Sequence, residues 1–352
     1  MKKKTAILGA TGIVGQQFIT LLENHPDFEI TALCASEKSE GKKYAEAANW
    51  MLKQNMPSWT KNETVLPSTP KEVEKAGNVD LVFSCLPANH AKKTEEEFAK
   101  AGFATVSKAS AHRMDFDVPL LIPEVNPEQL ELIQTQKKNR NWTGFVSTDP
   151  NCSTIQLAIA LKPLHDKYGL KDVTVTSMQA LSGAGHSGIA SLDITDNVIP
   201  FISGEEEKIE NETLKILGKT KSGKVENASF TVSASCNRVN VSDGHLESVF
   251  CELEKKASVE EVENAFKEFS GEPQKLQLHS APKKPIIVRK EENRPQPKFD
   301  KNAEKGMSIT IGRVRNDSRG RIKFSLLAHN TIRGAAGAGI LHAELLKAKK
   351  II

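Results

Sequence analysis

Apolar runs and helical segments alternate along the first 150 residues of the chain. Short apolar runs at 5–8, 28–35 and 79–84 are typical of buried strands, and segments with helical spacing follow at 16–22 and 89–101. Strands that alternate with helices in this way predict a parallel, doubly wound α/β sheet. The ligand of such a sheet binds at the carboxyl ends of its strands, so we expect a site there.

The pattern changes after residue 150. A helix is predicted from Cys152 to about Tyr168, where Gly169 stops it. Segments typical of strands follow, several of them alternating apolar and polar residues, at 173–180, 229–235, 245–252, 283–290, 307–315 and 321–328. So many strands indicate an α+β domain with a mostly antiparallel or mixed sheet. The closing segment, 330–352, predicts a helix whose small residues allow close packing, so we expect it to return to the first domain.

Length and composition narrow this picture. A chain of 352 residues is long for one core, so we expect two domains: a Rossmann-like dinucleotide-binding domain at 1–150, joined by the helix 330–352, and a second domain at 151–329. A net charge of +4 and an aromatic content of 5% argue against nucleic-acid binding. No apolar run approaches the roughly eighteen residues of a membrane span.

The cysteines and the N-terminus bear on the compartment. The five cysteines are scattered and include no CxxC pair, which predicts a reducing compartment without a disulfide framework or a metal cluster. The basic start, Met1 to Lys4, runs directly into a strand and lacks the apolar region of a signal peptide. We therefore expect a soluble, cytoplasmic protein that holds no metal.

A glycine turn joins the first strand to the first helix. Gly9, Gly12 and Gly15 form a variant of the dinucleotide fingerprint, in which the backbone can approach a pyrophosphate at the helix N-terminus. The strand before the turn and the helix after it are the context that this motif requires. A nucleotide-free turn is the weaker alternative.

The end of the second strand bears on which nucleotide is bound. An NAD site usually ends this strand with an acidic residue for the ribose 2′-hydroxyl, whereas this strand ends in Ala35-Ser36. Ser36, Lys38 and Ser39 suit the charge and oxygens of a 2′-phosphate, and Glu37 lies beyond the strand end. NADP is favoured, although the same residues would also suit an ordinary solvated loop.

Cys152 stands at the predicted start of a helix. Pro150 disfavours a helical conformation at the preceding residue, and Asn151 or Ser153 can cap the helix. A cysteine in this position is exposed to unpaired N–H groups that favour a thiolate, which is a nucleophile. The alternative is a buried structural cysteine, a common role of free thiols.

Further polar residues are weak candidates when taken singly. Arg238 could bind both oxygens of a carboxylate, His245 could exchange a proton near neutrality, and Arg113 could bind an anion. The glycine-rich loop 181–188 either passes close to a ligand or simply turns. The charged run 205–212 predicts a helix with a solvated face.

Taken together, these motifs resemble aspartate-β-semialdehyde dehydrogenase, and most closely its archaeal and fungal branch. The resemblance covers nearly the whole chain and rests on the segments 9–15, 110–113, 150–154, 182–185, 236–239, 244–247 and 330–337. Lys108 stands where the bacterial branch usually has asparagine, which agrees with this assignment.

The resemblance implies roles for the residues of the second domain. Cys152 matches the catalytic thiol, His245 the general acid/base and Gln179 the glutamine that orients the substrate. The substrate-binding and phosphate-binding residues that it implies are Asn151 beside the acyl oxygen, Glu205, Arg238 for the carboxylate, and Arg113 and Lys208 for phosphate.

The resemblance also implies an NADP(H) site. The cofactor-binding residues would be Gly9, Thr11, Gly12, Ile13, Val14, Ser36, Lys38, Ser39, Ser84, Leu86, Ser182, Gly183 and Asn330. Lys38 stands where this branch would be expected to have arginine.

The implied reaction is the NADPH-dependent conversion of L-aspartyl-4-phosphate to L-aspartate-4-semialdehyde and phosphate, through an acyl-thioester on Cys152. This step would serve the biosynthesis of lysine, threonine, methionine and isoleucine, in a homodimer or homotetramer formed through the second domain. The alternatives are a malonyl- or succinyl-CoA reductase, or an N-acetylglutamyl-phosphate reductase, on the same scaffold. A catalytically inactive NADP-binding sensor is the alternative outside the enzymes.

Overall fold

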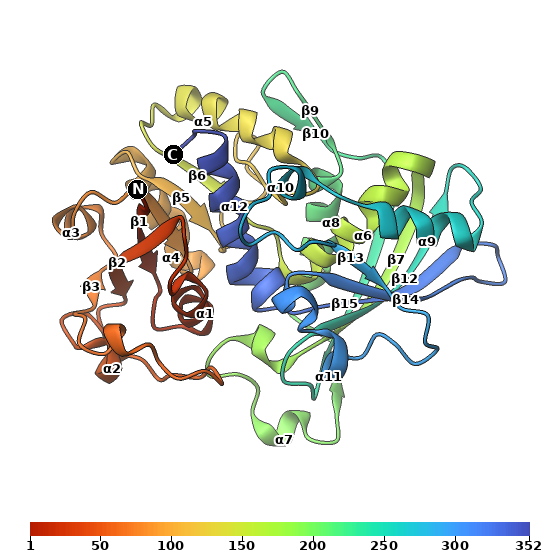
Figure 1. Cartoon of the computed structure of the whole chain (residues 1–352), viewed down its shortest axis with the longest axis horizontal. Coiled ribbons are helices and arrows are strands. Elements are labelled where there is room, and N and C mark those ends of the chain that lie inside the picture. The colour runs from red at the N-terminus through yellow and green to blue at the C-terminus, as the bar shows by residue number, and fades with distance from the viewer.

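The chain is built on two large β-sheets. The N-terminal segment is a strand of the first sheet, and the C-terminal helix packs against that same sheet (Figure 1). The computed structural model describes residues 1–352. The first sheet has six parallel strands in the order β3-β2-β1-β4-β5-β6, and the second has seven strands in the order β13-β14-β15-β12-β7-β11-β8. A parallel sheet with helices on both of its faces is the predicted doubly wound arrangement.

The elements of the first half follow the predicted alternation. Its strands are β1 (Lys3–Leu8), β2 (Phe28–Ala35), β3 (Leu66–Pro67), β4 (Leu81–Ser84), β5 (Ala104–Ser107) and β6 (Phe145–Thr148). Its helices are α1 (Ile13–Leu22), α2 (Tyr44–Ala47), α3 (Pro70–Lys75), α4 (Ala88–Lys100) and α5 (Leu132–Arg140).

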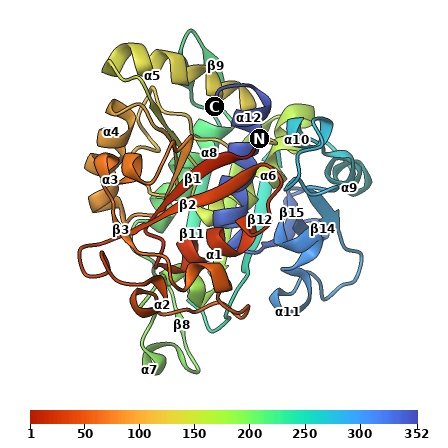
Figure 2. The same cartoon turned by 60° about the vertical axis from the view of Figure 1, so that its left-hand side comes forward.

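Each face of the first sheet has its own apolar core. Ile7 faces a cluster that includes Phe18 of α1 and Ile340 of the last helix, α12 (Gly337–Ala348). The alternate residue Leu8 faces a smaller cluster with Phe98 of α4. The closing helix therefore packs on the first sheet, between that sheet and the rest of the chain (Figures 1 and 2).

The second half contains the mixed sheet that the sequence predicts. Its remaining strands are β7 (Leu170–Gln179), β8 (Val198–Ile199), β11 (Thr231–Val239), β12 (His245–Leu253), β13 (Ile286–Val288), β14 (Ile309–Asn316) and β15 (Ile322–Ala328). A separate hairpin is formed by β9 (Lys219–Lys221) and β10 (Lys224–Glu226). The helices are α6 (Cys152–Tyr168), α7 (Ser191–Ile194), α8 (Glu205–Ile216), α9 (Val259–Glu268), α10 (Glu272–Lys275) and α11 (Pro297–Asp300).

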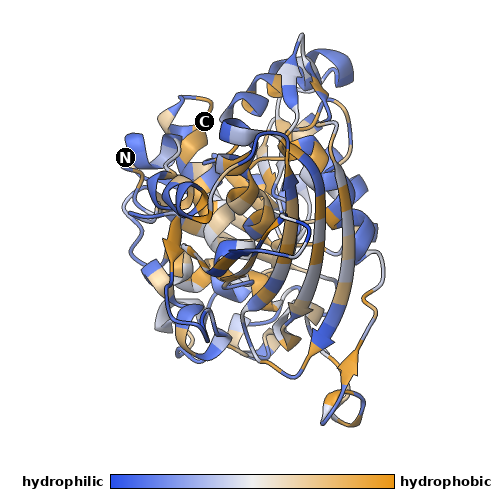
Figure 3. Ribbon diagram, turned by 90° about the vertical axis from the view of Figure 1, so that its right-hand side faces the viewer, coloured by the Kyte–Doolittle hydropathy of each residue, from blue (hydrophilic) through white to orange (hydrophobic).

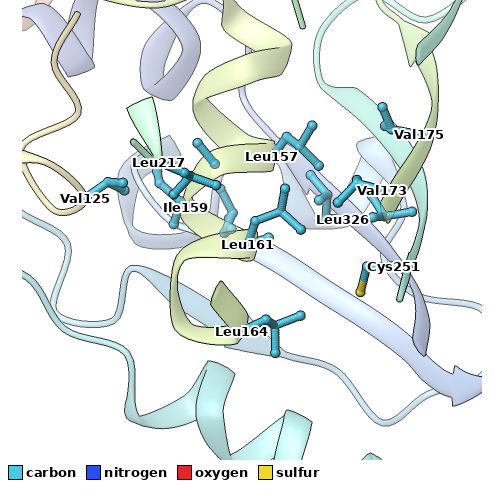
Figure 4. Packing of buried hydrophobic residues seen from close by; sticks show 14 of the residues in the cluster. Val125, Leu157, Ile159, Leu161, Leu164, Val173, Val175, Leu217, Cys251 and Leu326 are labelled. Atoms are coloured by element: carbon cyan, nitrogen blue, oxygen red, sulfur yellow. The ribbon is translucent and has the colours of Figure 1, made fainter. Parts of the chain in front are cut away.

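Helix α6 lies against one face of this mixed sheet. Leu157, Leu161 and Leu164 belong to the same buried cluster as Val173 and Leu326 of the sheet (Figure 4). Along the strands, hydrophobic and hydrophilic residues alternate, as expected when one face is covered (Figure 3). This packing fixes where the first turn of α6 lies.

The covered face changes from apolar to polar toward that first turn. One row across the strands pairs Val175 with Val249, and the next pairs Ser177 with Glu247. The row after that pairs Gln179 with Arg238, at the ends of β7 and β11. Polar side chains on the covered face of the sheet therefore lie together beside the start of α6.

Several predicted elements differ in extent from those observed. Strand β11 continues through 236–239, which the sequence pattern assigned to a connection, because its pairing with β7 extends to Gln179. The helix predicted from residue 330 begins with a π-helical turn, Ile332–Ala336, before α12. The short elements α3, α5 and the β9–β10 hairpin had no clear apolar pattern and were missed.

Candidate active site

Cys152 is the first residue of α6, directly after the turn that follows β6. The side-chain oxygen of Asn151 accepts hydrogen bonds from the backbone N–H groups of Ser153 (2.9 Å) and Thr154 (3.2 Å). Of the two possible caps, Asn151 is therefore the one in use. The fold presents the thiol at the helix start, as the sequence predicted.

A cavity of about 230 Å³ opens beside this thiol. It lies between the glycine turn of the first domain, the loop after β7 and the start of the closing helix. The predicted site residues that line it are Ile13, Val14, Arg113, Asn151, Cys152, Ser182, Gly183 and Asn330. Lys108, Pro150, Gly185, Thr331, Gly334 and Ala335 also line it, and no site role was assigned to them from the sequence.

The thiol does not have the low pKa that its helix position alone would give. Burial and the nearby Glu205 carboxylate raise the pKa of Cys152 to about 12. Arg113, the Ser153 N–H and Arg238 lower this pKa, but they do not outweigh the first two effects. The thiol is therefore protonated at neutral pH, and its proton has to leave before or during attack.

His245 and Arg238 are held by the same peptide segment, Ala180. The Ala180 N–H donates to Nδ1 of His245 (3.0 Å), and its carbonyl accepts from Nη1 of Arg238 (2.7 Å). Because Nδ1 accepts this bond, the neutral ring carries its proton on Nε2, which has no protein partner. Burial and the Arg238 charge lower the pKa of His245 to about 3, so the ring is neutral.

Gly183 separates these two side chains from the cavity. A Cβ on Gly183 would lie 2.9 Å from Nη1 of Arg238 and 3.0 Å from Nε2 of His245. A side chain at this position would displace the histidine, so the glycine leaves room for the buried Nε2 directly behind the cavity lining. Gln179 is buried nearby and donates to Ser177 Oγ (3.3 Å).

Helix α8 sends acidic side chains into the site. Glu205 accepts from Asn151 Nδ2 (2.6 Å) and from Lys208 Nζ (3.3 Å). Glu212 accepts from the Asn151 backbone N–H (2.7 Å) and from Nη1 of Arg113 (2.9 Å). The prediction of a solvated face for this helix is wrong for these residues, because Glu205 and Glu212 are buried.

The loop that carries Arg113 is fastened by a buried lysine of the same helix. Nζ of Lys215 donates to the carbonyls of Arg113 (2.7 Å), Asp115 (2.8 Å) and Val118 (2.9 Å). Burial lowers the pKa of this ammonium to about 8. Glu205, Lys208, Glu212 and Lys215 recur every three or four residues, and this spacing is the signal that could have identified the inner face.

The glycine turn has the geometry of a nucleotide cradle. Gly9 has φ +76°, and a Cβ there would lie 2.8 Å from the Cys85 carbonyl oxygen. A Cβ on Gly15 would lie 2.4 Å from the Gly9 carbonyl oxygen. Gly12 is the residue before α1, and Thr11 and Ile13 adjoin it. The turn therefore leaves open backbone at a helix N-terminus, the arrangement that suits a pyrophosphate.

The other predicted cofactor residues occupy three places. Ser36, Lys38 and Ser39 follow the end of β2, with the first two exposed. Ser84 is fully buried and donates to Glu95 (2.6 Å), so its hydroxyl is already bonded; half-buried Leu86 follows β4. Asn330 is positioned by bonds to Ser182 Oγ and the Gly244 N–H, both 2.8 Å.

None of the helices combines the length and the apolar character that crossing a bilayer would require.

Two family models match the chain. Residues 4–133 match the NAD binding domain of semialdehyde dehydrogenase, and residues 161–333 match the dimerisation domain of semialdehyde dehydrogenase.

Relatives match over essentially the full length. An aspartate-semialdehyde dehydrogenase of Methanothermobacter thermautotrophicus is 53% identical, covering 97% of each chain. The crystal structure of aspartate semialdehyde dehydrogenase with NADP from Candida albicans superimposes with a TM-score of 0.91 at 43% identity, covering 100% of each chain. A malonyl CoA reductase (NADP) of Metallosphaera sedula is 42% identical, covering 99% of this chain and 98% of its own.

Proposed function

Because the chain belongs to the semialdehyde dehydrogenase family, we propose that it is an NADP-dependent aspartate-semialdehyde dehydrogenase. Its reaction would be the reduction of L-aspartyl-4-phosphate to L-aspartate-4-semialdehyde, with release of phosphate, in the biosynthesis of lysine, threonine, methionine and isoleucine. The observation that carries this proposal is the capped Cys152 thiol in a cavity lined by the glycine turn and backed by Arg238 and His245.

The residues present fit NADP(H). The open backbone of Gly9 and Gly12 suits the pyrophosphate, and Asn330 offers a positioned amide in the cavity beside Cys152. After β2 the chain offers Ser36 and Lys38 where an NAD site would present an acid, which suits a 2′-phosphate. When bound, NADPH would supply the hydride.

Cys152 would carry the acyl group. Its sulfur would attack the acyl carbon and displace phosphate, giving a thioester that is readily formed from an acyl phosphate. The Asn151 amide would lie beside the acyl oxygen, while Arg113 and Lys208 would bind the phosphate. His245, the predicted acid/base, would present Nε2–H to the oxygen on which negative charge develops.

The substrate backbone would be bound on the other side of the thiol. The side chain of Arg238 donates from Nη1 to Ala180 and makes no other hydrogen bond to protein, so its remaining N–H groups suit a carboxylate. Buried Glu205 supplies a negative charge for the substrate ammonium, and Gln179 would orient the substrate. These charges would distinguish an amino acid from a simple dicarboxylic acyl group.

The second candidate is a CoA-thioester reductase, which the similarity to the malonyl CoA reductase favours. The two functions are separated by one comparison: NADPH formation from aspartate semialdehyde, NADP and phosphate, against NADPH oxidation by malonyl-CoA and succinyl-CoA. We expect the first activity to dominate. A higher kcat/KM with malonyl-CoA would overturn the proposal.

Alkylation distinguishes an enzyme from an NADP-binding sensor. Modification of Cys152 should abolish turnover and leave NADPH binding intact, and unchanged turnover would exclude the thioester route.

For the assembly, we propose a homodimer or homotetramer formed through the domain 151–329, with 1–150 and 330–352 as the nucleotide-binding domain; the match to a dimerisation domain at 161–333 supports this.

A further inference from the structure

Lys108 lines the Cys152 cavity, and the mechanism above gives it no role. Its side chain is only 8% exposed, and Nζ lies 3.2 Å from Oδ2 of Asp149 in an ion pair. Nζ makes no hydrogen bond of acceptable geometry to any protein acceptor. Because an ammonium has three donors, N–H groups of Lys108 remain free for a group that enters the cavity.

Two hydrogen bonds of its backbone fix the position of Lys108. Its N–H donates to the Ser84 carbonyl (2.9 Å), which places it at the end of β5. Its own carbonyl accepts from Nη2 of Arg113 (2.7 Å), so the two cationic residues are tied together and line one cavity. The phosphate that Arg113 would bind therefore lies in the cavity that Lys108 also lines.

A buried chain of polar groups fixes Asp149 on the side away from Lys108. Its Oδ1 lies 2.9 Å from Nδ1 of His342, and Nε2 of His342 lies 2.9 Å from Ser147 Oγ. Burial opposes ionisation of Asp149, but Lys108 and His342 hold its pKa below the usual value. The charged Asp149 keeps the ammonium of Lys108 in place beside the cavity that this residue lines.

The phosphate step needs a proton that few residues can give. Phosphate leaving as a trianion is a poor leaving group, so the oxygen that departs from the acyl carbon requires a proton. Arg113 cannot supply one, because a guanidinium does not deprotonate in proteins. Lys208, which would also bind the phosphate, pairs with Glu205, is one-third exposed and does not line the cavity, so of the two lysines it is the less well placed to give this proton.

The surroundings of Lys108 favour release of a proton. Burial lowers the pKa of its ammonium, and Arg113 acts in the same direction, while Asp149 and Cys85 oppose the shift. A lowered pKa brings a lysine closer to the working pH, where a general acid is most effective.

We propose that Lys108 is the catalytic acid/base of the phosphate step, a role that rests on the function proposed above. The Cys152 thiol first loses its proton to solvent, and as the bond from the thiolate sulfur to the acyl carbon forms, the bond from that carbon to the phosphate oxygen breaks, with its electron pair going to the oxygen. Lys108 Nζ gives that oxygen a proton, and the neutral amine regains one from solvent after phosphate leaves. In the reverse direction hydrogen phosphate attacks the thioester, and the neutral amine of Lys108 takes its proton.

The test separates the two half-reactions in Lys108→Arg, which keeps the charge and cannot exchange a proton. The burst of NADPH from aspartate semialdehyde and NADP without phosphate should match wild type within about two-fold, because it does not involve Lys108. The steady-state rate with phosphate should fall on the order of 100-fold, with a smaller change in KM for phosphate. The exposed Lys219→Arg is the matched control.

Three results would overturn this role. An equal loss of rate in the burst and in the phosphate step would assign Lys108 to the hydride step or to cofactor binding. Weaker NADP binding by the variant would also assign it to cofactor binding. Unchanged turnover with phosphate would leave the lysine a structural residue. Wild-type enzyme without phosphate-dependent NADPH formation would instead refute the proposed function itself.

A second measurement needs no variant. In wild type, the rate of the phosphate step should fall toward lower pH across an alkaline range in which phosphate stays a dianion, as Lys108 becomes protonated. The phosphate-free burst should instead follow the ionisation of the Cys152 thiol, whose pKa of about 12 lies above that of Lys108. Identical pH profiles for the two steps would refute the role of Lys108 independently of how the variants fold.

Discussion

The Ala180 N–H donates to Nδ1 of His245 over 3.0 Å, which leaves the proton of the neutral ring on Nε2. A charged imidazolium would place an N–H against an N–H at this contact, and the Arg238 charge disfavours it further. The backbone thus selects the form of His245 that donates a hydrogen bond into the site. The same residue holds Arg238 through its carbonyl, so one peptide segment positions both groups.

This relationship predicts a difference between two variants of His245. His245→Gln keeps an N–H donor near the position of Nε2, whereas His245→Ala removes it. We expect kcat to fall about 10-fold for the glutamine variant and about 100- to 1,000-fold for the alanine variant, the usual effect of losing an oxyanion donor. Steady-state kinetics check this. An equal loss of kcat in the two variants would show that proton transfer by His245 matters more than the hydrogen bond that its Nε2–H donates.

The reactivity of Cys152 should depend on Glu205. The Glu205 carboxylate is the second-largest cause of the raised thiol pKa, after burial, so Glu205→Gln should lower that pKa. More thiolate is then present at pH 8, and Cys152 should react faster with iodoacetamide in Glu205→Gln than in wild type. Rates between pH 7 and 11, with the labelled peptide identified by mass spectrometry, check this; slower labelling of the variant at every pH would contradict it.

The local parts of this fold and site follow from the sequence. Strand β2 and helix α6 lie at the predicted residues, 28–35 and 152–168, because each has a clear apolar pattern and α6 has both a cap and a terminating glycine. The glycine turn is equally local, since a strand and a helix flank it.

The missed contacts join residues far apart in the chain. Glu212 bonds the Asn151 backbone across 61 positions, and Lys215 bonds the Arg113 carbonyl across 102. Nothing near a glutamate in a charged run shows that its carboxylate is buried, because burial is set by the packing of α8 over β11 and α6. The role that we infer for Lys108 likewise depends on Asp149 and Arg113, which only the tertiary fold brings to it.

Lys215→Met should loosen the loop that carries Arg113. The variant loses three charge-assisted hydrogen bonds and leaves three carbonyls without this donor, so we expect it to be destabilised by about 3 kcal/mol or more. KM for phosphate should rise while the affinity for NADP is little changed, because the glycine turn is not involved. Thermal unfolding and steady-state kinetics check both, with exposed Lys219→Met as the control; an unchanged KM in a destabilised variant would show that Lys215 does not position Arg113.

Glu247 should make stability fall as pH rises from mildly acidic to mildly alkaline values. Burial raises the pKa of this carboxyl to about 8, and Gln156 donates to its Oε1 (2.6 Å). In the unfolded chain the group ionises near its ordinary pKa of about 4.3. Between these two pKa values the folded state binds more protons than the unfolded state, so stability is lost as pH rises. Glu247→Gln cannot ionise, so its melting temperature should decline less than that of wild type between pH 5 and pH 8. Exposed Glu252→Gln on the same strand should decline as wild type does. A wild-type melting temperature that falls no more steeply than that of Glu247→Gln would show that the carboxyl ionises at similar pH in the folded and unfolded states.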